Sequence, residues 1–152
     1  MKHVALFLFL ATGLASAADD ADSKQLLKDL EGTYKMTAAE HLGGPAPAGF
    51  LESIELVTIK GNKLSITFKG EGGKVEEKMA TILIDASKKP AQIDLKADEG
   101  EKKDHTVQGI VLLKNGTLKI CWNDGADAKR PADFKTSKDD KSMLLTLKKS
   151  KQ

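Results

Sequence analysis

The stretch that decides the fold is Gln108–Trp122, QGIVLLKNGTLKICW. Two apolar runs flank Asn115-Gly116, a dipeptide typical of the type I′ turn, because both central residues of that turn need φ > 0 and its twist matches that of paired strands. In the second run, every other residue from Leu118 to Trp122 is large and apolar, as on one face of a strand. The stretch therefore predicts a tight β-hairpin.

The first run, Gly109–Leu113, is apolar at every position, which predicts a central strand buried on both faces. A second tight turn is predicted at Gly61-Asn62. Further strands are predicted at residues 32–37, 55–60, 63–69, 78–85, 92–97 and 142–148. About eight short strands at this spacing favour an all-β fold, and an up-and-down antiparallel barrel is the simplest closure because it removes exposed strand edges.

The N-terminus reads as a secretory signal peptide, residues 1–17, with a short basic start, an apolar run and the cleavage pattern Ala15-Ser16-Ala17. A membrane-spanning helix is the alternative, but the run is shorter than the roughly 20 residues needed to cross a bilayer. We expect residues 18–24 to be an acidic disordered segment. Residues 25–152 are expected to form the barrel domain, beginning with one short helix, Lys24–Leu30, capped by Ser23. The protein is then exported to the periplasm or outside the cell.

Composition excludes several classes of protein. The chain has 24 Lys and Arg against 22 Asp and Glu, a net charge of +2, and this balance argues against nucleic-acid binding, which needs a basic face. No run after the signal peptide is long enough to span a membrane. Cys121 is the sole cysteine, so no intramolecular disulfide can form, and we expect a buried, inert thiol rather than a reactive one. The sequence leaves the oligomeric state open.

No catalytic arrangement or cofactor site is readable. His41 and His105 are far apart and lack zinc spacing, so solvated surface histidines are expected and no metal is predicted. Asn123–Asp127 resembles a calcium loop superficially, but it lacks the closing glutamate, and turn chemistry explains it equally well. We therefore predict that the protein is not an enzyme and carries no cofactor.

Four motifs together resemble the small lipocalin-like domain of unknown function that recurs in planctomycete bacteria. They are Leu30-Glu31-Gly32-Thr33-Tyr34, Lys88–Leu95 (KKPAQIDL), Gly109-Ile110 with Leu118–Cys121 (LKIC), and Arg130-Pro131-Ala132-Asp133-Phe134. The resemblance covers about residues 25–148 and implies an exported lipocalin-like barrel, with no activity to carry over. The first motif also resembles the Gly-x-Trp start of lipocalins, with Tyr34 in place of the tryptophan.

The resemblance implies a role for Arg130, the only arginine. Lipocalins carry a late basic residue that packs over the aromatic ring of the first strand. We therefore expect Arg130 to pack over Tyr34 or Trp122, with Phe134 anchoring the turn, because a guanidinium stacks well on rings. The alternative is an exposed arginine without a structural role.

Two functions remain open at this point. In the first, the barrel binds a small apolar ligand, with Tyr34 and Trp122 as candidates for lining its cavity. The Gly/Pro loop Gly43–Gly49 would then guard the mouth; its special residues are Gly43, Gly44, Pro45, Pro47 and Gly49. In the second, both aromatic rings belong to a filled core, and the protein acts at the cell envelope through surface contacts. A cavity of roughly 300 Å³ or more would favour the first function. A core filled to native density would favour the second.

Overall fold

The computed structural model of the chain describes residues 15–124 and 128–151. The predicted signal peptide lies outside the described residues up to position 14, and residues 125–127 of the calcium-like turn also lie outside them.

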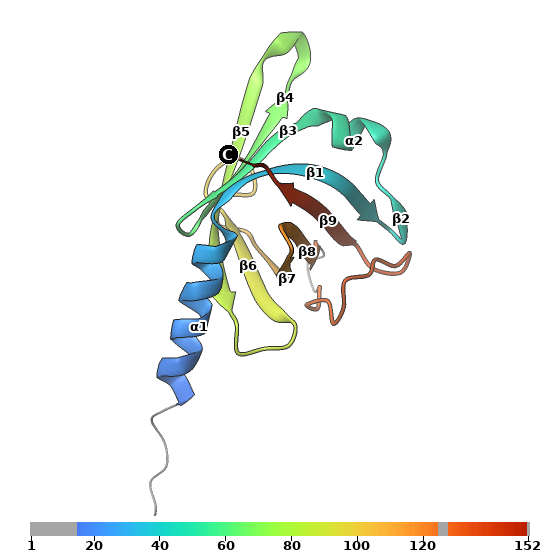
Figure 1. Cartoon of the computed structure of the whole chain (residues 1–152). Coiled ribbons are helices and arrows are strands. Elements are labelled where there is room, and N and C mark those ends of the chain that lie inside the picture. The colour runs from blue at the N-terminus through green and yellow to red at the C-terminus, as the bar shows by residue number, and fades with distance from the viewer. Residues whose placement is uncertain (1–14, 125–127, 152) are drawn as a thin grey trace, which may run out of the picture.

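Eight antiparallel strands form a closed up-and-down barrel, which confirms the predicted fold class (Figure 1). Each strand pairs with the next along the chain, and the last returns to pair with the first. The barrel strands are β1 (Gly32–His41), β3 (Ile54–Lys60), β4 (Lys63–Lys69), β5 (Val75–Asp85), β6 (Ala91–Ala97), β7 (Thr106–Lys114), β8 (Thr117–Asn123) and β9 (Ser142–Lys149). The two-residue strand β2 (Gly44–Pro45) folds back on the end of β1.

The hairpin predicted around Asn115-Gly116 is present as β7 and β8. Lys114 pairs with Thr117, and the two turn residues between them have positive φ, 51° at Asn115 and 72° at Gly116. The strand Gly109–Leu113 is buried on both faces at Ile110 and Val111, but Leu112 is 43% exposed. The second predicted tight turn, Gly61-Asn62, likewise joins β3 to β4.

The barrel has two different ends, named here by what they carry. At the helix end lie the start of β1 and the hairpin turn between β7 and β8. At the loop end lie the last residues of β1 and β8, the loop between β6 and β7, and the long connection between β8 and β9. The distinction matters because the two ends are filled differently.

The N-terminal helix is longer than predicted. Helix α1 (Ala15–Leu30) includes residues 18–24, which were expected to be disordered. Alanine has the highest helix propensity, and Lys24 lies 2.6 Å from Asp20 in an i,i+4 pair, so this acidic segment can extend the helix. Ser23 is not a cap: its hydroxyl accepts a hydrogen bond from the Ala86 amide at 3.0 Å and ties α1 to the β5–β6 turn.

Two further short helices lie in connections. Helix α2 (Ala48–Ser53) follows Pro47, so the Gly43–Gly49 segment is not one irregular loop but contains β2 and the start of α2. The second is the 3₁₀ turn η1 (Glu71–Gly73) at the tip of the β4–β5 hairpin. Within the described residues, no helix is both long and apolar enough to cross a membrane.

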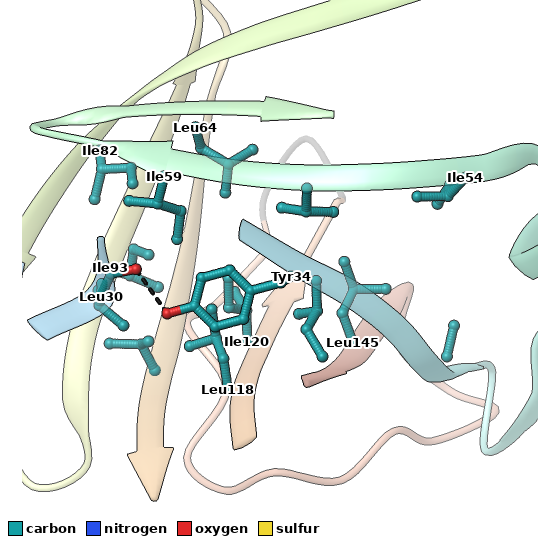
Figure 2. Packing of buried hydrophobic residues seen from close by; sticks show 14 of the residues in the cluster. Leu30, Tyr34, Ile54, Ile59, Leu64, Ile82, Ile93, Leu118, Ile120 and Leu145 are labelled. Carbon is teal, nitrogen blue, oxygen red and sulfur yellow. Dashed lines mark hydrogen bonds between the residues drawn. The ribbon is translucent and has the colours of Figure 1, made fainter. Parts of the chain in front are cut away.

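Large side chains fill the helix end of the barrel around Tyr34 (Figure 2). Tyr34 and Leu30 are both fully buried, and the Tyr34 hydroxyl donates to the Leu30 carbonyl at 2.7 Å. This bond satisfies a carbonyl at the C-terminus of α1, where helices leave such groups without intrahelical partners. Burial raises the pKa of Tyr34, so the hydroxyl remains a donor at neutral pH. Helix α1 thus seals this end.

We expect Tyr34→Phe to lower the free energy of unfolding by about 1 kcal/mol, because the Leu30 carbonyl loses its buried donor while the ring still fills the core. Urea unfolding with an unchanged m-value measures this. The control is Lys114→Ala at an exposed position, which should change stability by less than about 0.5 kcal/mol. A wild-type midpoint for Tyr34→Phe would show that the bond does not hold the helix.

Candidate functional site

An apolar cavity of about 290 Å³ lies inside the barrel toward the loop end. Its wall is made mainly by aliphatic side chains and one aromatic ring. The apolar lining residues are Val57, Leu64, Ile66, Met79, Ala80, Leu95, Ala97, Val107, Ile120, Trp122, Leu145 and Leu147. Several of these are core positions, since Val57, Ile120 and Leu147 are almost completely buried. The cavity therefore reaches from the mouth into the middle of the barrel.

The cavity exists because two small residues face each other at the end of the β5–β6 ladder, where these strands stop pairing. Ala80 and Ala97 are register partners on β5 and β6, and both line the cavity. Beyond Ala80, toward Val75, β5 pairs with β4 but no longer with β6. Two methyl groups thus stand where the helix end of the barrel has large side chains such as Ile82 and Ile93. Closed barrels of eight strands leave room for one small ligand when side chains do not fill them.

Gly109 allows β7 and β8 to approach each other beside the cavity. A Cβ at this position would lie 2.6 Å from the Cys121 carbonyl oxygen and 3.2 Å from the Trp122 Cβ. No side chain fits there without moving the neighbouring backbone. Gly109 is the register partner of Trp122. Because Gly109 has no side chain, the Trp122 indole can occupy its position in the cavity wall.

Charged side chains surround the mouth of the cavity. Lys78, Lys102, His105 and Asp124 all line it. Lys102 Nζ lies 3.0 Å from Asp124 Oδ2, and His105 Nε2 lies 3.5 Å from Asp124 Oδ1. Lys78 Nζ instead sits 5.3 Å from the centre of the Phe68 ring, as a cation–π contact. No local pattern in the sequence marks this group, because Lys102 lies in the charged stretch of residues 98–104, His105 follows it directly, and Lys78 lies in a predicted strand.

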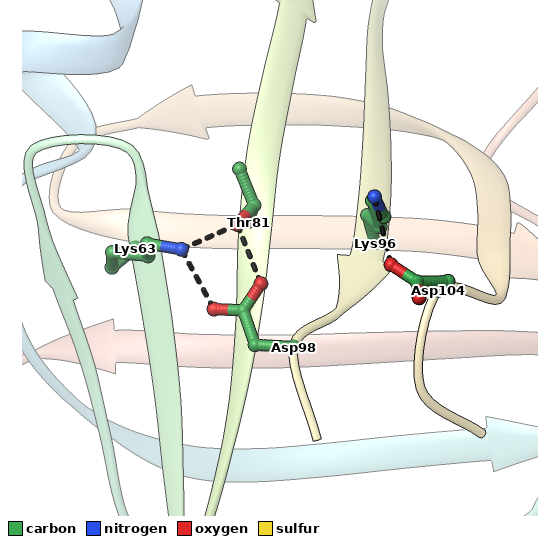
Figure 3. Close-up of polar contacts among 5 residues, drawn as sticks. All are labelled: Lys63, Thr81, Lys96, Asp98 and Asp104. Atoms are coloured by element: carbon green, nitrogen blue, oxygen red, sulfur yellow. Dashed lines mark hydrogen bonds and ion pairs between the residues drawn. The ribbon is translucent and has the colours of Figure 1, made fainter.

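Polar contacts fix the loop that carries Lys102 and His105 (Figure 3). At its start, Asp98 accepts hydrogen bonds from Lys63 at 2.8 Å and from Thr81 at 2.6 Å. The Lys63 ammonium, followed by the Thr81 hydroxyl, lowers the pKa of Asp98. Toward its end, Lys96 and Asp104 form an ion pair at 2.9 Å, which raises the pKa of Lys96. The loop is therefore tied to β4, β5 and β6 on both sides of Lys102.

The four aromatic and basic residues predicted to act together lie in three separate places. Trp122 lines the cavity, whereas Tyr34 belongs to the filled core at the helix end. Arg130 and Phe134 lie outside the barrel wall, on the connection between β8 and β9. Of the four, only Trp122 is therefore part of the candidate site.

The predicted mouth loop does not line this cavity. Gly43–Gly49 lies at the loop end, where the Gly43 amide donates to Thr136 Oγ1 at 3.1 Å and the Ala46 amide donates to the Ala39 carbonyl at 2.8 Å. These bonds hold it against β1 and the β8–β9 connection. The described mouth residues come instead from β5, from the β6–β7 loop and from Asp124, the first residue after β8.

The expected stacking of Arg130 on Tyr34 or Trp122 is wrong. Its guanidinium donates from Nη1 to the carbonyls of Gly109 at 2.6 Å and Ile93 at 3.2 Å, and Nη2 lies 2.8 Å from Asp94 Oδ1. The rings of Tyr34 and Trp122 are inside the barrel while Arg130 binds its outer surface. The cation near Tyr34 is Lys149, whose Nζ lies 5.8 Å from the ring centre.

Phe134 and Cys121 form a small apolar cluster outside the wall, with Ile110 and Leu144. Cys121 is completely buried there, and its thiol lies 3.8 Å from the Lys135 carbonyl. Burial, with smaller contributions from Asp140, Asp133 and Glu40, raises the pKa of the Cys121 thiol to about 11. The thiol is thus protonated at neutral pH. Arg130 and Phe134 together hold the β8–β9 connection against the barrel.

Neither histidine joins a cluster of potential metal ligands. His41 Nδ1 is 3.1 Å from the Ser142 carbonyl, and His105 faces Asp124. Within residues 15–124 and 128–151, no three His, Cys, Asp or Glu side chains come together as a metal site would require. The described part of the calcium-like turn makes protein contacts, since Asn123 Nδ2 donates to the Lys129 carbonyl.

We expect Arg130→Lys to lower the free energy of unfolding by about 1–2 kcal/mol, because one ammonium cannot serve two carbonyls and a carboxylate in the geometry of the planar guanidinium. The neighbouring Lys129→Ala should cost less than about 0.5 kcal/mol. A double-mutant cycle with Asp94→Asn should show coupling. If Arg130→Lys and Arg130→Ala both unfold at the wild-type urea midpoint, this contact does not stabilise the protein.

The folded protein should resist thiol labelling at pH 8. A pKa of about 11 instead of 9.0 leaves about a hundredfold less thiolate, and burial blocks access as well. Reaction with a coloured disulfide reagent should be slow in buffer and fast in denaturing guanidinium chloride. Equal rates in both solutions would contradict the buried position of Cys121.

Comparison with protein-family models, with curated proteins and with solved structures found no match for this chain.

Proposed function

We propose that this protein is an exported binding protein, not an enzyme, and that it holds a small apolar ligand in the barrel cavity. The observation that carries the proposal is the apolar cavity of about 290 Å³ around Trp122, with its charged mouth at the loop end. Its volume is at the lower edge of the range of about 300–1,000 Å³ that is usual for small-molecule pockets. The ligand is therefore small.

The contrast between the two ends of the barrel supports binding. A domain that needed only stability would gain by filling this space, because each buried methylene contributes about 0.8 kcal/mol and empty space costs packing energy. The helix end is filled in this way around Tyr34 and Leu30. The loop end instead has Ala80 and Ala97 opposite each other. An apolar ligand would recover the missing contacts.

Trp122 provides a direct test because it is the only tryptophan in the chain and lines the cavity. We expect 1-decanol, a small neutral amphiphile, to change the emission of Trp122 with saturation at one equivalent. Isothermal titration calorimetry should give the same stoichiometry. An unchanged emission and no heat would favour the alternative function, an envelope protein that acts through surface contacts.

Ala80→Leu should weaken decanol binding by about tenfold or more, because extra methylenes in an occupied site cost about 1–3 kcal/mol. The free protein should not lose stability, since the new side chain enters empty space. The matched control is Ala38→Leu on an exposed position of β1, which should leave the affinity within about twofold. Equal affinities for both variants would place the ligand elsewhere.

Export rests on the N-terminal pattern, with a basic start, an apolar run and Ala15-Ser16-Ala17. Cleavage after Ala17 would remove the first residues of α1 and leave the part that carries Leu26, Leu27 and Leu30 against the core. Protein recovered from outside the cytoplasm should begin near Ala18 on N-terminal sequencing. Full-length protein starting at Met1 and confined to the cytoplasm would contradict export.

A further inference from the structure

We infer that the ligand is a single-chain amphiphile with an anionic head, such as a fatty acid, whose head binds Lys78 and Lys102 at the mouth while the tail enters the cavity. The inference rests on the proposed binding function and adds the charge of the ligand and its orientation. It depends on three features of the mouth: an excess of cations, the position of Lys78, and the weak pairing of Lys102.

Among the residues that the structure describes, the charges that line the cavity are not balanced. Two lysines, Lys78 and Lys102, stand against one carboxylate, Asp124, and His105 adds positive charge when protonated. The rest of the lining is apolar. A ligand with an apolar body and a negative head matches this arrangement, because the tail replaces water on the aliphatic wall and the head offsets the excess positive charge. A positive head would meet two ammonium groups.

The Lys78 ammonium is placed to bind the head of a ligand, because no described carboxylate of the chain pairs with it. It is the register partner of Ile66, and both residues line the cavity, so the lysine extends from the inner side of the β4–β5 ribbon. Its ammonium rests over the Phe68 ring at 5.3 Å. Among the described side chains, no carboxylate oxygen lies within 4.0 Å of Lys78 Nζ. Every ion pair found there involves another cation.

Lys102 is paired, but the pairing is easily exchanged. Its side chain is 69% exposed and that of Asp124 is 39% exposed, and ion pairs between such exposed groups contribute little. A carboxylate at the mouth would compete with Asp124 for the same ammonium. The backbone need not move, because the amides of Asp98 and Asp104 donate to the carbonyls of Met79 and Ala97 and so hold the loop on both sides of Lys102.

Because Asp124 and the ligand compete for the same cations, substitutions at the mouth should change the affinity for an anionic ligand in opposite directions. Removing a lysine weakens the anion site, whereas Asp124→Asn releases Lys102 and His105 to the ligand and keeps the size of the side chain. A merely structural role for these residues would not produce opposite changes for an anionic ligand and no change for a neutral one with the same tail.

The experiment measures the binding of decanoate, 1-decanol and decyltrimethylammonium to the full chain by Trp122 emission and calorimetry. The two ionic amphiphiles are kept below their micelle concentrations and decanol below its solubility limit. Decanoate should bind more tightly than decanol, and its advantage should shrink as salt rises, because exposed charges are screened. Lys78→Gln and Lys102→Gln should each weaken decanoate about two- to fivefold, and Asp124→Asn should strengthen it by a similar factor. Decanol affinity should stay within about twofold in all variants.

The matched control is Lys114→Gln, an exposed lysine beside the turn at the helix end, which should leave decanoate binding unchanged. Thermal unfolding of each free variant verifies that it is folded. If decanoate and decanol bind equally, or if the cationic amphiphile binds best, the inference about the head is wrong while the cavity still binds. If none of the three binds the folded wild type, the proposed function itself fails.

Discussion

The return of β9 to β1 is the constraint on which the rest of the structure depends. Tyr34 to His41 of β1 pair with Met143 to Lys149 of β9, while β1 pairs with β3 only at residues 32–34. This ladder converts a meander of neighbouring hairpins into a closed wall and removes the two exposed edges that the meander would otherwise present. After Tyr34, β1 continues along β9 and no longer pairs with β3. The two strands β1 and β3 therefore separate toward the loop end, where α2 lies in the connection between them (Figure 1).

Closure fixes the interior, and side-chain size then divides it. At the helix end, Leu30, Tyr34 and Ile82 fill the space, and the hydrogen bond from Tyr34 to the end of α1 satisfies the one buried polar group of that ring. At the loop end, the pairing of Ala80 with Ala97 leaves the cavity. Large side chains thus fill one end of the barrel, and the cavity lies toward the other.

The β8–β9 connection shows how a long irregular segment is held without regular secondary structure. Phe134 contributes apolar contact with Ile110 and Cys121 outside the wall, and Arg130 binds Asp94 and two strand carbonyls. These contacts cover Ile110 of β7 and Cys121 of β8 from outside, so β7 is buried on both faces there, as its apolar run predicted. An apolar run in a strand shows that both faces are buried. It does not show whether the outer face is covered by another strand layer or by an irregular segment, as it is here.

The sequence by itself determined the local elements. The Asn115-Gly116 and Gly61-Asn62 turns and the alternation of apolar residues in the strands depend on backbone geometry within a few residues, and they were enough to predict an eight-stranded antiparallel barrel. Only the tertiary structure decided where the cavity lies, that Lys78 and Lys102 share its mouth, and that Arg130 binds outside the wall rather than on a ring. These features join residues from strands far apart in sequence, and their geometry follows from barrel closure and strand register, which no local pattern encodes.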